Sequence, residues 1–367
     1  MATDIKKLFE ALTQHQAYLY RASSKTVNEL LALFNDDTSK MLSKLRDLLD
    51  ELNESEKVAL AGGKYTTSNL REIRDLIAQW FASVNLALPE AFAVSATALA
   101  VYEANYMAKL YGGKIKKPNG EKLYAAAKKI PLVGGALVDD LLSRIAENAR
   151  QKVEYAIRDG INSGKTNQEI VQRIRGTKRL NYEDGLLSSS KTDIERTVRT
   201  VRSHVANQTY LDTFKQLGFE YVRFISVLDG RTSKLCASLD GSVWEINDPA
   251  KRVPPLHPHC RSILVPVEKD GRLAGERPFV MDERKVKDIP KDERSQLIGQ
   301  LDANTTFKEF FKKTDDFFQR EWLGPKRFKL YKDGKFDFDK FFDPEGRLYS
   351  LDDLRKVDEK AFKKLGL

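Results

Sequence analysis

The first part of the chain carries hydrophobic residues three and four positions apart, the spacing of one face of an α-helix. Polar residues fill the positions between them. These stripes include Ile5, Leu8, Phe9 and Leu12; Val27, Leu30, Leu31 and Phe34; Leu42, Leu45 and Leu49; and Leu70, Ile73, Ile77, Trp80 and Val84. Such a pattern is typical of helices that pack by one apolar face, and it predicts an all-helical N-terminal region.

The pattern changes between Tyr221 and Val267. Residues 221–228 and 262–267 are rich in β-branched and apolar side chains, which predicts two strands. Asp-Gly, Asp-Pro and Pro-Pro pairs lie between them and indicate turns. We therefore expect a compact β unit with a long connection, whose two polar ends meet at one end of the sheet.

The remaining segments have weaker patterns. Thr166 followed by Glu169 predicts a capped helix, and a long helix is expected from Asp193 to about Gly218. Residues 268–300 are charged and contain two prolines, which predicts an extended excursion with few core contacts. The last 67 residues hold eleven of the nineteen phenylalanines, enough for a small core or for a docking surface.

These patterns predict a predominantly α protein with a small α+β central domain. We expect a helical N-terminal region, a compact central β unit and a small aromatic-rich C-terminal module. The predicted boundaries are 1–111 for the helical region, 112–129 for a basic linker, 130–267 for the central domain, 268–300 for a charged extended segment and 301–367 for the C-terminal module.

Composition limits the classes of protein to which this chain can belong. The longest apolar run, Ala91–Val101, is too short to span a bilayer, and no secretion signal opens the chain, so we expect no membrane partner and a cytoplasmic site of synthesis. Two cysteines provide no disulfide framework. The net charge of +9 favours an acidic partner.

Basic residues gather in two places. Arg196, Arg199 and Arg202 recur every three residues on the predicted long helix, and Lys116 and Lys117 belong to a lysine-rich turn. Either group would contact DNA nonspecifically or bind an acidic partner. The alternative is a solvated face whose arginines pair with neighbouring Asp and Glu.

Scarce, chemically versatile side chains are concentrated in the β unit. A D-x-R-T-x-x-x-C turn ends at Cys236, a Gly-Ser-Val-Trp segment follows, and a P-P-L-H-P-x-C-R segment ends at Arg261. Together they resemble the signature of the Mu F-like phage head morphogenesis proteins, with coverage from about Ile145 to Val267. The residues that carry the resemblance are Asp229, Arg231, Thr232, Cys236, Gly241, Pro254, Pro255, His257, Cys260 and Arg261.

Two parts of the chain depart from the family pattern, and one further part outside the central domain resembles it. His259 stands where the family usually has a small polar residue such as Asn, and the first 110 residues resemble nothing that we can place. Residues 317–354 are similar to the closing segment of such proteins.

This resemblance implies a structural, non-enzymatic minor head protein of a tailed bacteriophage. It would be bound to the portal vertex and act in head assembly and in DNA packaging or ejection. Its expected partners are the portal protein, the major capsid or scaffold protein and packaged DNA. It would lie in the virion head near the portal vertex, after assembly in the host cytoplasm. The alternative is a Mu F module attached to a toxin, or a metal-dependent hydrolase.

The cysteines and histidines allow several kinds of site. Cys236, His257 and Cys260, with His259 or Asp229 as a fourth ligand, would suit a structural zinc ion, although no cofactor is required. A metal-free core with Arg261 paired to Asp229 is an alternative, and a disulfide is a third. An enzymatic site would use Asp229 or Asp240 as a base beside a metal, or Cys236 as a nucleophile with His257 as its base.

Overall fold

The computed structural model describes residues 5–132 and 134–367, with side chains from residue 11 onward except that of Ala17. The predicted apolar positions Ile5, Leu8 and Phe9 therefore lie outside the described side chains. The protein is 62% helical with about 8% strand, which confirms the predicted fold class. The chain forms two compact units, each built from stretches that are separated in the sequence.

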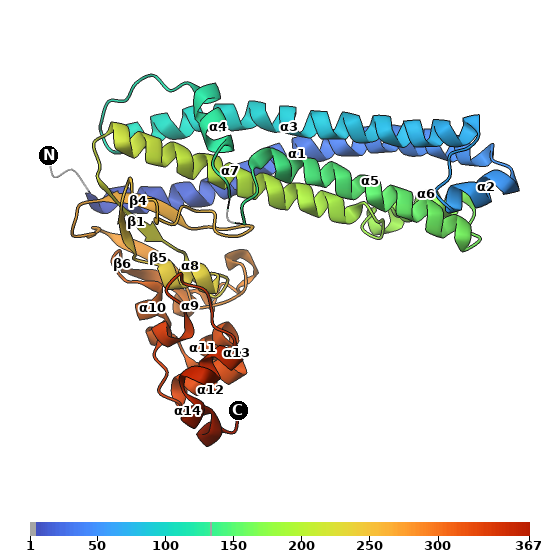
Figure 1. The fold of residues 1–367 in the computed structure, drawn as a ribbon. Helices are drawn as coiled ribbons and strands as arrows, with labels where there is room; N and C mark the ends of the chain where they lie inside the picture. Colours follow the sequence, from blue (N-terminus) through green and yellow to red (C-terminus); the bar gives the residue numbers. More distant parts are fainter. Residues whose placement is uncertain (1–4, 133) are drawn as a thin grey trace. The chain divides into compact units, whose positions relative to one another are not determined.

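The first unit, called the helical unit, comprises Tyr20–Tyr102 and Pro118–Ala206. Its long helices lie side by side (Figure 1). The helices that contribute to it are α1 (Ile5–Asp50), α2 (Glu54–Ala61), α3 (Ser68–Leu110), α4 (Gly120–Lys128), α5 (Val138–Asn162), α6 (Asn167–Arg175), the 3-10 helix η1 (Lys178–Leu180) and α7 (Ser188–Gln216). Helices α1, α3 and α7 also extend into the second unit.

The helical unit is held together by the apolar stripes seen in the sequence. Leu30, Leu45, Ile73, Phe92 and Leu142 are all completely buried. Capping boxes start two of its shorter helices, at Asn53 with Glu56 and at Thr166 with Glu169, so exposed backbone N–H groups are satisfied locally. The predicted all-helical region and the Thr166 cap are both confirmed.

Helix α3 is the single helix, among residues 5–132 and 134–367, that is long and apolar enough to cross a membrane by length and composition. A helix buried in the core of a soluble protein passes the same test. Of the apolar window of α3, 33% is buried inside the protein, and Phe92, Ala96 and Ala100 of this helix are completely buried.

The second unit, called the motif unit, contains the start of the chain up to Leu19, Glu103–Lys117 and Asn207–Leu367. One sheet has the antiparallel order β3-β1-β4 and contains both predicted strands. The other has the order β2-β5-β6, with β2 parallel to β5. The elements are β1 (Tyr221–Ile225), β2 (Leu228–Asp229), α8 (Lys234–Leu239), β3 (Val243–Glu245), β4 (Ile263–Val267), β5 (Glu276–Val280) and β6 (Ile298–Asp302).

Residues 268–300 differ from the predicted extended excursion. They contain β5, the 3-10 helix η2 (Val286–Asp288), α9 (Arg294–Leu297) and most of β6. Strand β5 lies in the middle of its sheet, and its Arg277 is only 2% exposed. The charged sequence pattern did not indicate this strand. The reason is that the buried Arg277 guanidinium is paired with Asp240, which lies in a distant part of the sequence.

The C-terminal phenylalanines form a core. The elements are α10 (Phe307–Lys313), α11 (Asp316–Leu323), α12 (Pro325–Lys332), the 3-10 helix η3 (Phe338–Phe341), α13 (Leu351–Val357) and α14 (Glu359–Leu365). Their aromatic cluster includes Phe311, Trp322 and Phe338, and it also includes Leu228 and Ala237 of the motif region. The packed-core interpretation is therefore confirmed, and this module shares its core with the segment that carries the family resemblance.

Candidate functional site

The two halves of the motif reach the same end of the first sheet because β1 and β4 are paired. Ile225, the last residue of β1, is in register with Ile263, the first residue of β4. The first half continues from β1 through β2 into α8, and the second half leads directly into β4. The predicted meeting of the two polar clusters is confirmed.

Local hydrogen bonds place the chemically versatile side chains. The Ser233 hydroxyl caps α8 by accepting from the backbone N–H of Cys236 at 3.2 Å, so the thiol lies in the first turn of that helix. On the other half, the N–H of Cys260 donates to the carbonyl of His257 at 3.1 Å. This turn follows the buried Pro254–Pro255 pair, whose peptide bond is cis.

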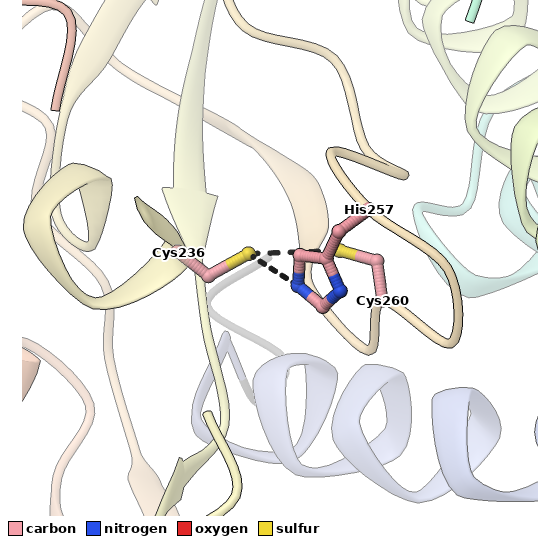
Figure 2. Close-up of side chains that lie close together, drawn as sticks. All are labelled: Cys236, His257 and Cys260. Atoms are coloured by element: carbon pink, nitrogen blue, oxygen red, sulfur yellow. Dashed lines mark hydrogen bonds between the residues drawn. The ribbon is translucent and has the colours of Figure 1, made fainter. Parts of the chain in front are cut away.

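Cys236, His257 and Cys260 form one cluster, and their side chains point toward one another (Figure 2). The Cys236 Sγ lies 3.3 Å from the His257 Nε2 and 3.6 Å from the Cys260 Sγ. All three atoms lie within 4.8 Å of one another. Both thiols are buried and free, whereas His257 is partly exposed. Three of the predicted zinc ligands are thus brought together.

The protonation of the cluster is set by these contacts. The His257 Nδ1 lies 2.8 Å from the Pro258 carbonyl oxygen, so it carries the proton and leaves Nε2 facing the thiols. The hydrogen bond from Cys236, helped by His257, lowers the pKa of Cys260 well below its usual range despite burial. The same contact with Cys260, together with burial, raises the pKa of Cys236. The hydrogen bond with Cys260 raises the pKa of His257, although burial acts in the opposite direction.

The two candidates for a fourth ligand lie outside this cluster. His259 is exposed, and its backbone has a φ of 58°, in the left-handed region that Asn adopts more readily than most residues. Asp229 is almost completely buried, but its oxygens are occupied by other groups. The structure therefore does not bring His259 or Asp229 to the thiols.

Asp229 joins the two halves of the motif. Both of its carboxylate oxygens accept hydrogen bonds from the Arg261 guanidinium, at 2.6 and 2.7 Å. The Arg231 N–H and the Thr232 hydroxyl donate to Oδ1 at 3.1 and 3.2 Å. Such a bidentate, fully satisfied carboxylate holds structure together. The pairing of Arg261 with Asp229 is therefore present in the structure, alongside the thiol cluster.

Asp240 forms a second buried centre that the sequence did not predict. It accepts from the backbone N–H groups of Ser226 and Phe307, both at 2.6 Å, and from the Arg277 guanidinium at 2.9 and 3.2 Å. The Arg277 guanidinium also donates to the carbonyls of Ser226 and Thr305. The sequence made Asp240 a candidate general base, but both of its oxygens already accept hydrogen bonds from the Arg277 guanidinium and from backbone N–H groups. Arg277 is one arginine in a charged segment, so the sequence did not indicate that it is buried beside Asp240.

The other motif residues also serve packing. Gly241 has a φ of +89°, and a Cβ there would lie 2.7 Å from Cγ2 of Thr306, so a larger residue would disturb the junction with α10. The Thr232 carbonyl accepts the indole N–H of Trp322 at 3.0 Å, and Pro255 is buried. Each of these residues fixes the motif or joins it to the aromatic core.

The predicted arginine ridge is used largely inside the helical unit. The Arg199 guanidinium donates to the Tyr20 carbonyl at 2.7 Å and to the Ser23 hydroxyl at 2.6 Å, and its side chain is 11% exposed. Arg202 donates to hydroxyls of α1 and α3 at 3.0 and 2.6 Å. Arg196 is half exposed and pairs with Asp193. By contrast, Lys114, Lys116 and Lys117 are exposed.

A family model described as "Phage Mu protein F like protein" matches residues 151–265. The matched segment begins within α5 and ends within β4, and it contains the Cys236, His257 and Cys260 cluster as well as both Asp229 and Asp240. This confirms the resemblance stated from the motif residues, and it identifies the segment with a family of phage head morphogenesis proteins. No curated protein and no solved structure matches the chain.

Proposed function

Given a Mu F-like segment at residues 151–265, we propose that this protein is a structural minor head protein of a tailed bacteriophage, bound at the portal vertex. It acts in head assembly and, while carried in the virion, in DNA packaging or ejection. The observation that carries the proposal is the coincidence of the family match with a motif whose residues meet at one end of a sheet.

Two buried carboxylates of the matched segment support a structural role. Asp229 and Asp240, the two candidate bases, are each held by an arginine, Arg261 and Arg277 respectively. Their partners lie far apart in the sequence, so each carboxylate fastens two segments. A protein of this kind works by presenting a rigid surface, and the proposed protein is not an enzyme.

The portal is the proposed main partner, and the helical unit is the proposed contact. Large apolar side chains are exposed on its helices, including Val58 on α2 and Leu86 and Val94 on α3, which are 72%, 61% and 75% exposed. Apolar residues in the centre of an interface supply much of its binding energy. The major capsid or scaffold protein is a further proposed partner in the same assembly.

Co-expression of the full chain with the portal protein of its phage tests this proposal. The chain is expected to sediment with portal rings and to be present in purified virions. Leu86→Asp with Val94→Asp is expected to abolish co-sedimentation, whereas Val357→Asp, at a residue that is 64% exposed on α13, is the matched control and should leave it intact. Absence of the chain from both portal fractions and virions would overturn the proposal.

The exposed lysine stretch is the proposed contact with packaged DNA. Lys114, Lys116 and Lys117 are exposed, whereas two of the three ridge arginines bond to neighbouring helices. Binding through such lysines depends on counterion release, so affinity should fall steeply with salt and ignore base sequence.

The salt dependence of DNA binding tests this contact. Replacing all three lysines by glutamine should reduce the slope of log affinity against log salt by up to about 0.9 for each phosphate that is no longer neutralised. A control with the same change in charge, Lys312, Lys313 and Lys326 to glutamine, removes exposed lysines of the C-terminal helices and should leave the slope unchanged. Equal slopes in both triple variants, or no binding at ~50 mM salt, would assign the lysines to a protein partner instead.

A further inference from the structure

We propose that Cys236, His257 and Cys260 bind a single zinc ion, so that the protein supplies three ligands to it. Zinc with Zn–S bonds of about 2.3 Å and Zn–N bonds of about 2.0 Å holds tetrahedral ligand atoms roughly 3.5–3.8 Å apart. The Cys236 Sγ lies 3.6 Å from the Cys260 Sγ and 3.3 Å from the His257 Nε2. The three donor atoms are therefore already spaced closely enough to share one ion.

The imidazole is oriented for binding. Its Nδ1–H donates to the Pro258 carbonyl at 2.8 Å, which directs the unprotonated Nε2 toward the sulfurs. Metal-binding histidines commonly make such a hydrogen bond through their other ring nitrogen, because it fixes both the tautomer and the ring. The backbone N–H of Cys236 donates to the Ser233 hydroxyl at 3.2 Å, which fixes the start of the helix that carries this thiol. The surroundings of the three ligands thus resemble those of a metal site.

The chemistry of the donors selects the ion. Two thiolates and one imidazole favour zinc or another thiophilic ion over magnesium or calcium, which prefer oxygen ligands. Two thiolates also neutralise a divalent ion, so no further charge is needed. The adjacent Arg261 is already paired with Asp229 and does not compete for the thiolates.

The place of the cluster explains what the ion would do. Cys236 lies on α8, whereas His257 and Cys260 end the long connection that leads into β4. None of residues 247–253 of that connection is buried, so few apolar contacts hold it. An ion bound between α8 and the end of the connection would add to the packing of Pro254, Pro255 and Leu256 and so fix the end of a loop whose middle is not buried.

Three protein ligands leave one position of a tetrahedral ion. Among the residues that the structure describes, no fourth His, Cys, Asp or Glu joins the cluster. The remaining position is therefore assigned to a solvent molecule, beside a histidine that is itself partly exposed. This inference concerns the ligands alone and does not depend on the proposed role in the phage head.

Metal analysis of the full chain, purified without chelator, tests the site. Wild-type protein is expected to hold about one zinc per chain, and the Cys236→Ser and His257→Gln variants less than about a tenth. His259→Asn is the matched control, because it changes the neighbouring histidine outside the cluster, in a conformation that Asn tolerates; it should keep its zinc.

Cobalt substitution provides a second measurement that does not rely on variants. Protein freed of zinc and then titrated with Co²⁺ should show intense thiolate-to-cobalt charge-transfer absorption that saturates at about one equivalent. Wild-type protein without zinc and without this absorption would overturn the proposal. So would an intact mass lower by two hydrogens with no free thiols, since the cysteines would then be joined as a disulfide.

Discussion

The helical unit and the motif unit differ in how some of their carboxylates are held. In the helical unit, capping boxes such as Thr166 with Glu169 join residues three positions apart, and the apolar stripes supply the core. In the motif unit, Asp229 binds Arg261 and Asp240 binds Arg277, across 32 and 37 positions of sequence. The helix caps of the first unit are local, whereas these ion pairs of the second unit join segments that are distant in sequence.

The difference predicts unequal sensitivity to single substitutions. Removing one apolar side chain weakens a bundle whose core is spread over many residues. Removing one partner of a buried ion pair leaves the other charge unsatisfied in a dry environment, which is among the most destabilising single changes. The motif unit should therefore be more sensitive to the loss of a single buried charge than the helical unit is to the loss of a single apolar side chain.

Asp240→Ala should have the largest effect. It leaves the Arg277 charge and the N–H groups of Ser226 and Phe307 without their acceptor, at an expected cost of about 3–5 kcal/mol in unfolding free energy. Denaturation followed by fluorescence measures it, because Trp244 and Trp322 both lie in the motif unit.

The double variant Asp240→Ala with Arg277→Met refines this prediction. Removing both charges should recover part of the lost stability, since no unpaired charge remains. A single variant as stable as wild type, or a double variant that is no better than the single one, would contradict the role given to this pair.

Arg199→Met should have an intermediate effect, in the helical unit. It removes hydrogen bonds to the Tyr20 carbonyl and to the hydroxyls of Ser23 and Ser24, at an expected cost of about 1–3 kcal/mol. The control is Arg196→Met on the same helix, where the side chain is half exposed and the change should stay within about 0.5 kcal/mol. Thermal melting followed by circular dichroism compares the two variants. Equal melting temperatures would contradict this role of Arg199 and support the exposed arginine ridge predicted from the sequence.

His204 should give the smallest effect, visible only as pH falls. Burial lowers the pKa of this histidine, although its ring is hydrogen-bonded to the Ala127 carbonyl. The unfolded chain takes up a proton near pH 6.5 and the folded chain does not, so stability decreases below that pH, by at most ~1.4 kcal/mol per pH unit. His204→Gln retains an N–H donor without titrating, and its melting temperature should depend less on pH between about 7 and 5. Parallel pH profiles would contradict the prediction.

The sequence was most informative where structure is local or where a motif is known. Helical spacing predicted the bundle, and Thr166 with Glu169 predicted a cap, because both depend on residues within one or two turns. The motif pattern alone was enough to single out Cys236, His257, Cys260, Asp229 and Arg261. The prediction that these residues lie together followed from placing them at the same end of the sheet formed by the two predicted strands.

Long-range pairing was the part that the sequence did not predict. Strand β5 falls in a stretch whose pattern predicts an extended segment, since its Arg277 looks like any surface charge until Asp240 is placed beside it. Arg199 and Arg202 looked like a positive ridge because helical spacing gives a face but not the helix that covers it. His259 was a candidate ligand by its proximity in sequence, whereas its left-handed backbone belongs to an exposed turn. The predicted domain boundaries remain a prediction.

The central claim is that buried ion pairs such as that of Asp240 with Arg277 hold the fold of the motif unit together. Amide hydrogen exchange of Asp240→Asn against wild type tests it most directly, because exchange reports local stability along the whole chain. The account predicts that β1, β5 and α10 lose protection together, while α5, which lies entirely in the helical unit, keeps its protection. Loss of protection confined to the residues next to Asp240, or an equal loss in α5, would contradict it.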